Sequence, residues 1–480
     1  MAPCFGRIAS AKKHLQNKKP LAMKHSKKQI HSKTHATPTL RFENQKLTSF
    51  SGLIIFQKLF KKLSLQEKLR QCFKHRKVSP IFGDATIVLL LVVHLLLGYR
   101  ELRHLSFYQD DPMVKRLLNL KKLPDVATIS RTLSDMDDES VSRYLTIANI
   151  LVLNRLRTQS LPRVTLDFDG SVIGTNRYAE GTAVGFNLKK KGQRSYYPLF
   201  CTVAQTGQVL NLLHRPGNVH DSKGAEDFIL ECVKQVRNTL PNTIIEVRMD
   251  GAFFSETIIS ALENHQVQYT VSVPFERLLA LKDKVDKRCK WIDLDHTSDY
   301  FELHWKPKSW GHKKRFIAVR QARKTQQKGP VQLDIFTPSD YHWEYKVILT
   351  NKKIKVKKVV SYHNGRGSQE SIFAELKSCN QMDYVPTRTL AGNQIYLISA
   401  VMAHNLTKEL QMINQDSDRK TQEKRPALWK FKKLSTIRQQ IIQRAGRMIK
   451  PQGKIVLSMA ANEKVKSEIL HFLAKLEEVA

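Results

Sequence analysis

Three short segments each place an acidic residue where a strand should end or a helix should begin. They are Leu-Asp-Phe-Asp-Gly-Ser at 166–171, Arg-Met-Asp-Gly at 248–251 and Gly-Arg-Gly-Ser-Gln-Glu at 365–370. Carboxylates in such places are a common means of collecting divalent-cation ligands from distant parts of a chain. Two Mg²⁺ ions about 3.5–4 Å apart can activate the attacking oxygen and stabilise the leaving oxygen of a phosphodiester. Asp169, Asp250 and Glu370 are therefore candidate catalytic and metal-binding residues.

Each acid also has a purely structural interpretation. Asp169 and Asp250 both precede a glycine and could shape turns, and Glu370 could be a charge favoured by a helix dipole. Asp167 is a further candidate metal ligand, because residues two apart on a strand lie on the same face. The residues alone leave the choice between Asp167 and Asp169 open.

The third segment is more specific than the other two. On a helix Arg366, Glu370 and Lys377 share one face, since Lys377 follows Glu370 by seven residues. An ordinary surface ion pair is the alternative interpretation. With Tyr362 upstream, the pattern Tyr-x₃-Arg-x₃-Glu-x₆-Lys resembles the signature around the last glutamate of many bacterial insertion-sequence transposases.

From about Leu47 to about Met459 the sequence resembles the insertion-sequence transposases whose catalytic region is called transposase DDE domain group 1. The matching stretches are Thr165–Ser171, Gly185–Asn187, Tyr196–Leu199, Arg215–His220, Arg248–Phe253, Asn364–Glu370 and Glu375–Lys377. The resemblance implies an RNase H-like fold, two divalent metal ions (Mg²⁺, with Mn²⁺ as a substitute) and cut-and-paste transposition. It also implies double-stranded DNA partners, the element ends and the target, bound by a homodimer or higher multimer.

The family's three acids fall on Asp169, Asp250 and Glu370 in this sequence. Asp169 is preferred to Asp167 because Gly170-Ser171 follows it, as the motif expects. Tyr362 stands one residue further from Arg366 than the usual signature has it.

Several basic and aromatic residues are expected to bind DNA. Arg366 and Lys377 would hold a phosphate near the metal ions. The loop at 189–194 would contact the DNA backbone, unless it is merely a solvated loop. The resemblance also suggests that Trp305 or Trp310 stacks on a flipped base, although aromatic residues more often belong to a core. The complete set of expected DNA-binding residues is Arg366, Lys377, Tyr362, Lys189, Lys190, Lys191, Arg194, Trp305, Trp310 and His220.

Apolar spacing predicts the elements that must position these residues. Residues 47–157 have helical periodicity, whereas from Arg163 apolar and polar residues alternate as in a strand. A hairpin over 196–214 and alternating helices and strands follow, so the predicted fold class is α/β with a mixed sheet. The predicted parts are a basic disordered arm (1–46), a helical DNA-binding domain (47–160), a catalytic core in two pieces (161–274 and 345–413), a β-rich insertion (275–344) and a basic C-terminal region (414–480).

The composition favours a polyanionic partner. Lys and Arg number 80 against 43 Asp and Glu, a net charge of +37 that is spread along the chain. The six cysteines have no metal-ligand spacing, which suits a reducing cytosol. The resemblance to insertion-sequence transposases implies that this is the cytoplasm of a bacterium, with the protein at the nucleoid. The apolar run Ile87–Leu97 is too short to span a membrane.

Two other functions remain compatible with these patterns. One is an RNase H-like nuclease or resolvase that hydrolyses DNA without strand transfer. The other is a DNA-binding protein without catalysis, whose sequence would be expected to lack one of the three acids.

Overall fold

The computed structural model describes residues 36–76, 81–185, 187, 190–220, 223–322 and 343–478. The chain divides into two compact units, Met1–Gln45 and Lys46–Ala480. In the first unit only residues 36–45 are described, and they contain no helix or strand. The predicted disordered arm therefore lies mostly outside the described residues, and every element below belongs to the second unit.

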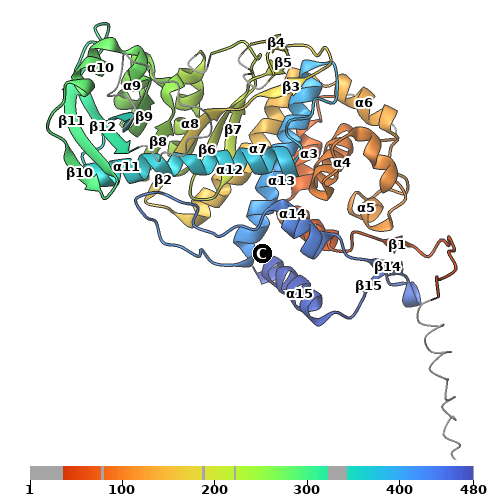
Figure 1. Ribbon diagram of the computed structural model, residues 1–480. Coiled ribbons are helices and arrows are strands. Elements are labelled where there is room, and N and C mark those ends of the chain that lie inside the picture. Colours follow the sequence, from red (N-terminus) through yellow and green to blue (C-terminus); the bar gives the residue numbers. More distant parts are fainter. Residues whose placement is uncertain are drawn as a thin grey trace, which may run out of the picture. The chain divides into compact units, whose positions relative to one another are not determined.

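A nine-stranded mixed sheet forms the centre of the second unit (Figure 1). Five of its strands are β2 (Arg163–Gly170), β6 (Leu199–Val203), β7 (Gln208–Leu213), β8 (Ile244–Met249) and β9 (Gln268–Val273). They lie in the order β7-β6-β2-β8-β9, with β6 antiparallel to its neighbours and β2, β8 and β9 parallel. Three antiparallel strands followed by two parallel ones form an RNase H-like sheet, which confirms the predicted α/β fold class.

Four further strands continue this sheet, and the outer three of them lie in the predicted insertion (275–344). β13 (Trp343–Thr350) pairs antiparallel with β9, and β12 (Lys314–Ala322), β11 (Ser298–Trp305) and β10 (Ile292–Asp295) follow outward. Alternate residues of β12 point to opposite faces, as strand geometry requires. Phe316 and Ala318 join the main sheet core, whereas Ile317 and Val319 pack in a separate cluster with helix α11 (Val356–Asn364).

Helices cover both faces of the sheet. α8 (Ala225–Thr239) packs on β6, β7 and β8, and α9 (Glu256–Asn264) packs on β9. α11 continues through a short turn, η4 (Gly365–Gly367), into α12 (Ser368–Cys379). The start of α12 at Ser368 is where the sequence predicted it.

The part before the sheet is helical, as expected. Its main helices are α2 (Leu53–Lys62), α3 (Leu65–Cys72), α4 (Asp84–Leu97), α6 (Val126–Ser134) and α7 (Asp138–Gln159). Residues Ile87–Leu97 of α4 are all buried, and Gly98 ends that helix with a positive φ of 90°. The long helix α13 (Leu390–Asn414) packs against both α4 and α7. The helical part and the sheet therefore belong to one compact unit.

The C-terminal region contributes a helix and two strands of a small three-stranded sheet. Strands β1 (Leu47–Thr48), β14 (Gly446–Ile449) and β15 (Val456–Met459) pair in the order β1-β14-β15, and α15 (Glu463–Glu478) follows. Among the described helices, none combines the length and the apolar character needed to cross a bilayer.

Candidate active site

The first two candidate acids lie at neighbouring strand ends. β2 and β8 run parallel with Phe168 opposite Met249, so Asp169 and Asp250 each follow a paired residue. Asp250 also begins a short turn, because its Oδ1 accepts a hydrogen bond from the Ala252 amide at 3.0 Å. Parallel strands end at the same edge of a sheet, which is how residues far apart in the sequence come to share one site.

The third acid-bearing segment is attached to the end of β2 by two contacts. Arg366 Nη1 lies 3.3 Å from Asp169 Oδ2, and Gln369 Nε2 donates to the Asp167 carbonyl oxygen at 3.0 Å. Glu370 follows in the first turn of α12, and its side chain is exposed. The structure thus brings together the three segments that carry Asp169, Asp250 and Glu370.

These residues fit a divalent cation in type, since all offer hard carboxylate oxygens. The carboxylates are not gathered around one point: within the described ranges, no group of three or more His, Cys, Asp or Glu side chains is arranged to hold an ion. The Arg366 guanidinium instead supplies positive charge beside Asp169. Asp169 Oδ1 accepts from the Gly170 amide at 2.8 Å, which fixes the orientation of the carboxylate.

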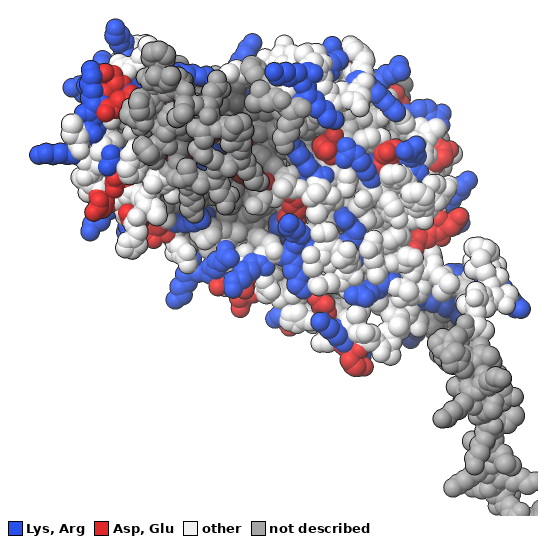
Figure 2. Space-filling model, in the orientation of Figure 1, with Lys and Arg blue, Asp and Glu red and all other residues white. Residues whose placement is uncertain are grey.

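A basic cleft opens on the Asp169 side of the site. It has a volume of about 870 Å³ and begins at Gly170 and Ser171. Its cations come from three distant parts of the chain: Arg100, Arg103, Arg177, Lys190 and Lys377. Lys190 and Lys377 were predicted, whereas the three arginines were missed because no local motif marks them. Figure 2 shows further Lys and Arg side chains over the described part of the visible face, with Asp and Glu side chains among them.

The other predicted loop cations lie at or near the surface. Lys191 and Arg194 are exposed, and the Arg194 guanidinium donates to Thr182 and lies 5.3 Å from the centre of the Tyr178 ring. Lys189 is outside the described residues. The role of this loop in binding DNA stays a prediction.

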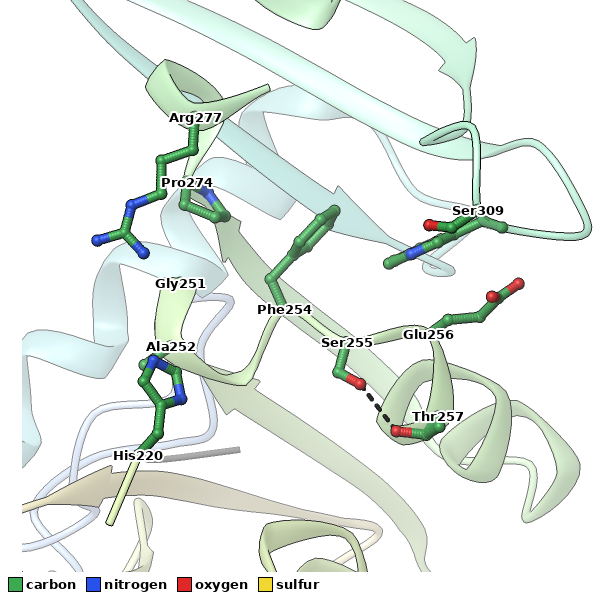
Figure 3. A pocket seen from close by; sticks show the side chains of 11 residues that line it. His220, Gly251, Ala252, Phe254, Ser255, Glu256, Thr257, Pro274, Arg277 and Ser309 are labelled. Carbon is green, nitrogen blue, oxygen red and sulfur yellow. Dashed lines mark hydrogen bonds between the residues drawn. The ribbon is translucent and has the colours of Figure 1, made fainter. Parts of the chain in front are cut away.

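A second pocket, of about 650 Å³, lies on the Asp250 side (Figure 3). Gly251 and Ala252 form part of its wall, and the predicted residues His220 and Trp310 line it. Trp310 is only 6% exposed and stacks on Phe254 with ring centres 4.8 Å apart. Trp305 is half-buried and packs edge-on against Phe316, so it lies against the main sheet core.

Asp167 occupies a different environment from Asp169. Its two carboxylate oxygens accept from Arg248 Nε at 2.5 Å and Nη2 at 2.7 Å, and both side chains are buried. Burial alone would lower the pKa of Arg248, but Asp167 beside it raises that pKa, so the guanidinium stays charged. This arrangement occupies both carboxylate oxygens of Asp167 and so contradicts the expectation that it is a further metal ligand.

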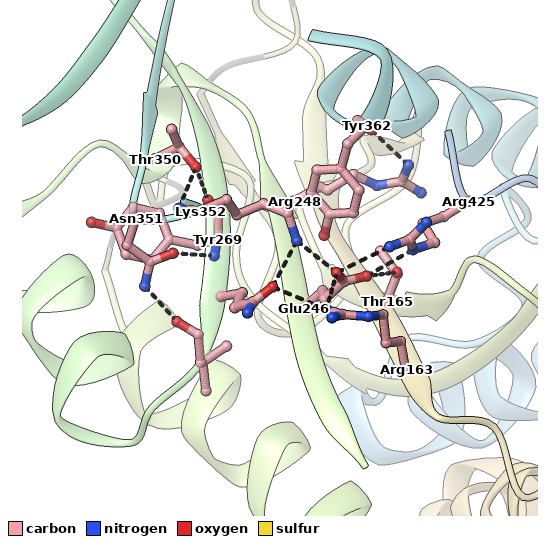
Figure 4. A network of polar contacts seen from close by, with 12 residues as sticks. Arg163, Thr165, Glu246, Arg248, Tyr269, Thr350, Asn351, Lys352, Tyr362 and Arg425 are labelled. Atoms are coloured by element: carbon pink, nitrogen blue, oxygen red, sulfur yellow. Dashed lines mark hydrogen bonds and ion pairs between the residues drawn. The ribbon is translucent and has the colours of Figure 1, made fainter. Parts of the chain in front are cut away.

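Tyr362, expected to contact DNA, is instead buried beneath the site. Lys352 Nζ lies 4.2 Å from the centre of its ring, and the guanidinium carbons of Arg248 and Arg425 lie at 5.3 and 5.8 Å (Figure 4). A ring face attracts cations, so Tyr362 stabilises this charged layer. The prediction that it contacts DNA is wrong for this conformation.

Glu246 is the carboxylate of the same layer, and sequence patterns did not reveal it. It is fully buried and accepts from Lys352 Nζ at 2.6 Å, Arg425 Nε at 2.9 Å and Thr165 Oγ1 at 3.0 Å (Figure 4). Burial alone would raise the pKa of Glu246, but Arg425 and Lys352 hold it at about 2. The only local sign was a charged residue inside a predicted strand.

The sheet order and the carboxylates at its edge are typical of RNase H-like enzymes that act on phosphodiesters. The family described as transposase DDE domain group 1 matches residues 31–480, and the chain belongs to this family. It is a DDE transposase, an enzyme that cleaves DNA and joins DNA strands, and such enzymes generally use divalent metal ions.

Solved structures similar to this chain include three transposase complexes. A piggyBac transposase synaptic complex with hairpin DNA is 11% identical, covering 82% of this chain and 80% of its own, with a TM-score of 0.40. A Mos1 transposase paired-end complex with left transposon end is 11% identical, covering 41% and 60%, with a TM-score of 0.17. A Mos1 mariner paired-end complex with Mn is 13% identical, covering 42% and 65%, with a TM-score of 0.17. No curated protein matches the sequence.

Proposed function

We propose that this transposase moves an insertion sequence by a cut-and-paste route, with Asp169, Asp250 and Glu370 as the ligands of two Mg²⁺ ions. The observation that carries the proposal is the meeting of the β2 end, the β8 end and the start of α12, joined by the Arg366–Asp169 ion pair. Bound Mg²⁺ would activate the attacking oxygen and stabilise the leaving one, and Mn²⁺ would serve as a substitute.

The chain's own cations orient the DNA in this proposal. Arg366 releases Asp169 and holds a phosphate in forked geometry, and Lys377 adds a point charge from α12. The basic cleft on the Asp169 side is the proposed path of the strand, because it combines cations with the rings of Tyr197 and Tyr384. On the Asp250 side, the exposed His220 would contact a displaced base, beside the wall that Trp310 and Phe254 form.

We also propose how the transposase assembles and where in a bacterial cell it acts. A homodimer or higher multimer would hold two element ends together, as the family resemblance implies. Cleavage of both ends in one complex would then be followed by joining to target DNA. The site of action would be the bacterial nucleoid, where that DNA lies.

The test is a cleavage and joining assay with DNA fragments taken from both flanks of the gene. We expect Mg²⁺ or Mn²⁺ to support cutting at a defined end and joining of that end to a second DNA, and EDTA to abolish both. Asp250→Asn keeps an oxygen for the Ala252 amide and should bind DNA but lose cleavage. Cleavage in EDTA, or parental cleavage by Asp250→Asn, would refute the site. Cleavage without joining would instead indicate a nuclease or resolvase.

A further inference from the structure

Arg248 is a fully buried arginine whose guanidinium has protein partners at every nitrogen. Nε and Nη2 donate to the two carboxylate oxygens of Asp167, at 2.5 and 2.7 Å. Nη1 donates to the carbonyl oxygens of Tyr362 at 3.0 Å and Lys424 at 2.9 Å. The Tyr362 ring also lies near the guanidinium carbon, at 5.3 Å. A planar group held on all sides in this way is fixed in position.

Arg248 and two of its partners, Asp167 and Tyr362, belong to the segments that carry the three acids. Asp167 precedes Asp169 by two residues on β2, and Arg248 itself precedes Asp250 by two residues on β8. The Tyr362 carbonyl lies near the end of α11, just before the turn that carries Arg366 and leads to Glu370. One side chain therefore connects the end of β2, the end of β8 and the entry to α12.

Gly365 shows how closely the third segment approaches this guanidinium. A Cβ at that position would lie 2.0 Å from Arg248 Nη1 and 2.0 Å from the Lys424 carbonyl oxygen. Those distances are far below van der Waals contact, so any larger residue would push the turn and the guanidinium apart. Residue 365 thus allows the acid-bearing segment to rest on Arg248.

We infer that Arg248 is a positioning residue that sets the spacing of the three metal-binding carboxylates. This inference rests on the proposed roles of Asp169, Asp250 and Glu370. The alternative is that Arg248 and Asp167 form an ordinary core ion pair, which contributes to stability and has no influence on the metal site. The two interpretations differ in what a small change at Arg248 does to metal binding in a folded protein.

Arg248→Lys is the main test variant. A lysine keeps the charge but is a point donor, so it cannot hold Asp167 in two places and Tyr362 as well. We expect the folded variant to cleave DNA on the order of 10²-fold more slowly, the effect of a misplacement of about 1 Å. It should also need more Mg²⁺ for half-maximal cleavage. Independently of activity, the rise in Tm on adding Mn²⁺ should be smaller than in the parent.

Arg155 and Glu409 provide a matched control. They form another buried, two-point pair, with Arg155 Nε 2.9 Å and Nη2 2.5 Å from the carboxylate oxygens, and they join α7 to α13. Neither helix carries a candidate acid. Arg155→Lys should lower the Tm in a similar way but leave the Mg²⁺ requirement and the Mn²⁺-induced rise in Tm as in the parent.

Gly365→Ala is the second variant and decides the matter if Arg248→Lys does not fold. It leaves every charge in place and should reproduce the weaker metal response by displacing the turn. The inference would be overturned by a folded Arg248→Lys or Gly365→Ala variant with the parental cleavage rate, Mg²⁺ requirement and Mn²⁺-induced rise in Tm. If Asp250→Asn were inactive in the same assay, the proposed function would still stand. Full activity of Asp250→Asn would overturn the proposed function itself.

Discussion

Two glutamates of α12, only five residues apart, have opposite environments. Glu370 is exposed and directly follows Gln369, whose side chain contacts the Asp167 carbonyl near the end of β2. Glu375 is buried, with its Oε2 accepting from Lys408 Nζ at 2.8 Å and its Oε1 from the Leu434 amide at 2.9 Å. A change at Glu375 would therefore report on folding, whereas Glu370 is the glutamate of α12 that we propose as a metal ligand.

Glu370→Gln is the sharpest test at the level of single residues. The amide keeps the length of the side chain but is a poor ligand for Mg²⁺, so cleavage should fall by several orders of magnitude while DNA binding and folding persist. Single-turnover cleavage and a DNA-binding titration would measure the two effects.

Glu463→Gln is the matched control, because Glu463 is an exposed glutamate in the first turn of α15. Both changes remove a charge favoured by a helix dipole, which costs about 0.3–1 kcal/mol. Equal loss of cleavage in the two variants would mean that helix stability, and not metal binding, explains the result.

At the scale of elements, the chain after α13 supports the sheet although residues 415–433 contain no helix or strand. Arg425 reaches Glu246 in β8, the Lys424 carbonyl meets Arg248, and the Leu428 amide donates to the Gln205 carbonyl at 2.8 Å. This segment helps to cover the polar face of β2 and β8. The composition predicted only that this region is basic, and it gave no sign of these contacts with the sheet.

Glu246→Gln should unfold more easily than the parent, because Lys352 and Arg425 would lose their buried counter-charge. Removing one partner of a buried ion pair costs about 3–5 kcal/mol. The pKa of Glu246 is about 2 in the folded protein against 4.5 for an ordinary glutamate. The unfolded chain therefore binds a proton at Glu246 more tightly than the folded protein does. The ionised carboxylate contributes roughly 3 kcal/mol to the free energy of unfolding, and this contribution is complete above about pH 4.5 and is lost as the pH falls towards 2.

Urea unfolding at several values between about pH 5 and 3 would measure this contribution. The parent should lose stability faster than Glu246→Gln as the pH falls. Glu302→Gln, which removes an exposed strand glutamate paired with Arg315, should keep the parental slope. Parallel slopes for the parent and Glu246→Gln would contradict the ionised, buried state of Glu246.

At the scale of the whole molecule, the net charge of +37 predicts that affinity for DNA depends strongly on ionic strength. If about six to ten phosphates are contacted, affinity should fall by about 10³–10⁵ between about 50 and 200 mM salt. Fluorescence anisotropy with labelled duplex DNA would give the slope of log affinity against log salt. A flat profile would contradict phosphate binding as the main source of affinity.

The basic cleft makes a more specific prediction within that titration. Arg177→Ala with Lys190→Ala removes two exposed cations that line it, so the slope should become shallower by about 2. Replacing Lys464 and Lys466 of α15 by alanine is the control and should leave the slope nearly unchanged. The same loss from both pairs would indicate diffuse charge and no preferred path.

The sequence by itself determined the family, the sheet type and the three acid-bearing segments, since strand alternation, glycine-marked turns and short motifs are local features. Only the tertiary structure separated Asp167 from Asp169. Both residues fit the strand alternation of β2. Asp167 pairs with the buried Arg248, which the carbonyls of Tyr362 and Lys424 also hold, whereas Asp169 lies at the edge of the sheet. The surroundings of Tyr362, of Glu246 and of the arginines in the basic cleft were likewise revealed only by the tertiary structure. Burial and charge pairing depend on what packs from elsewhere in the chain, and no pattern along a single segment contains that information.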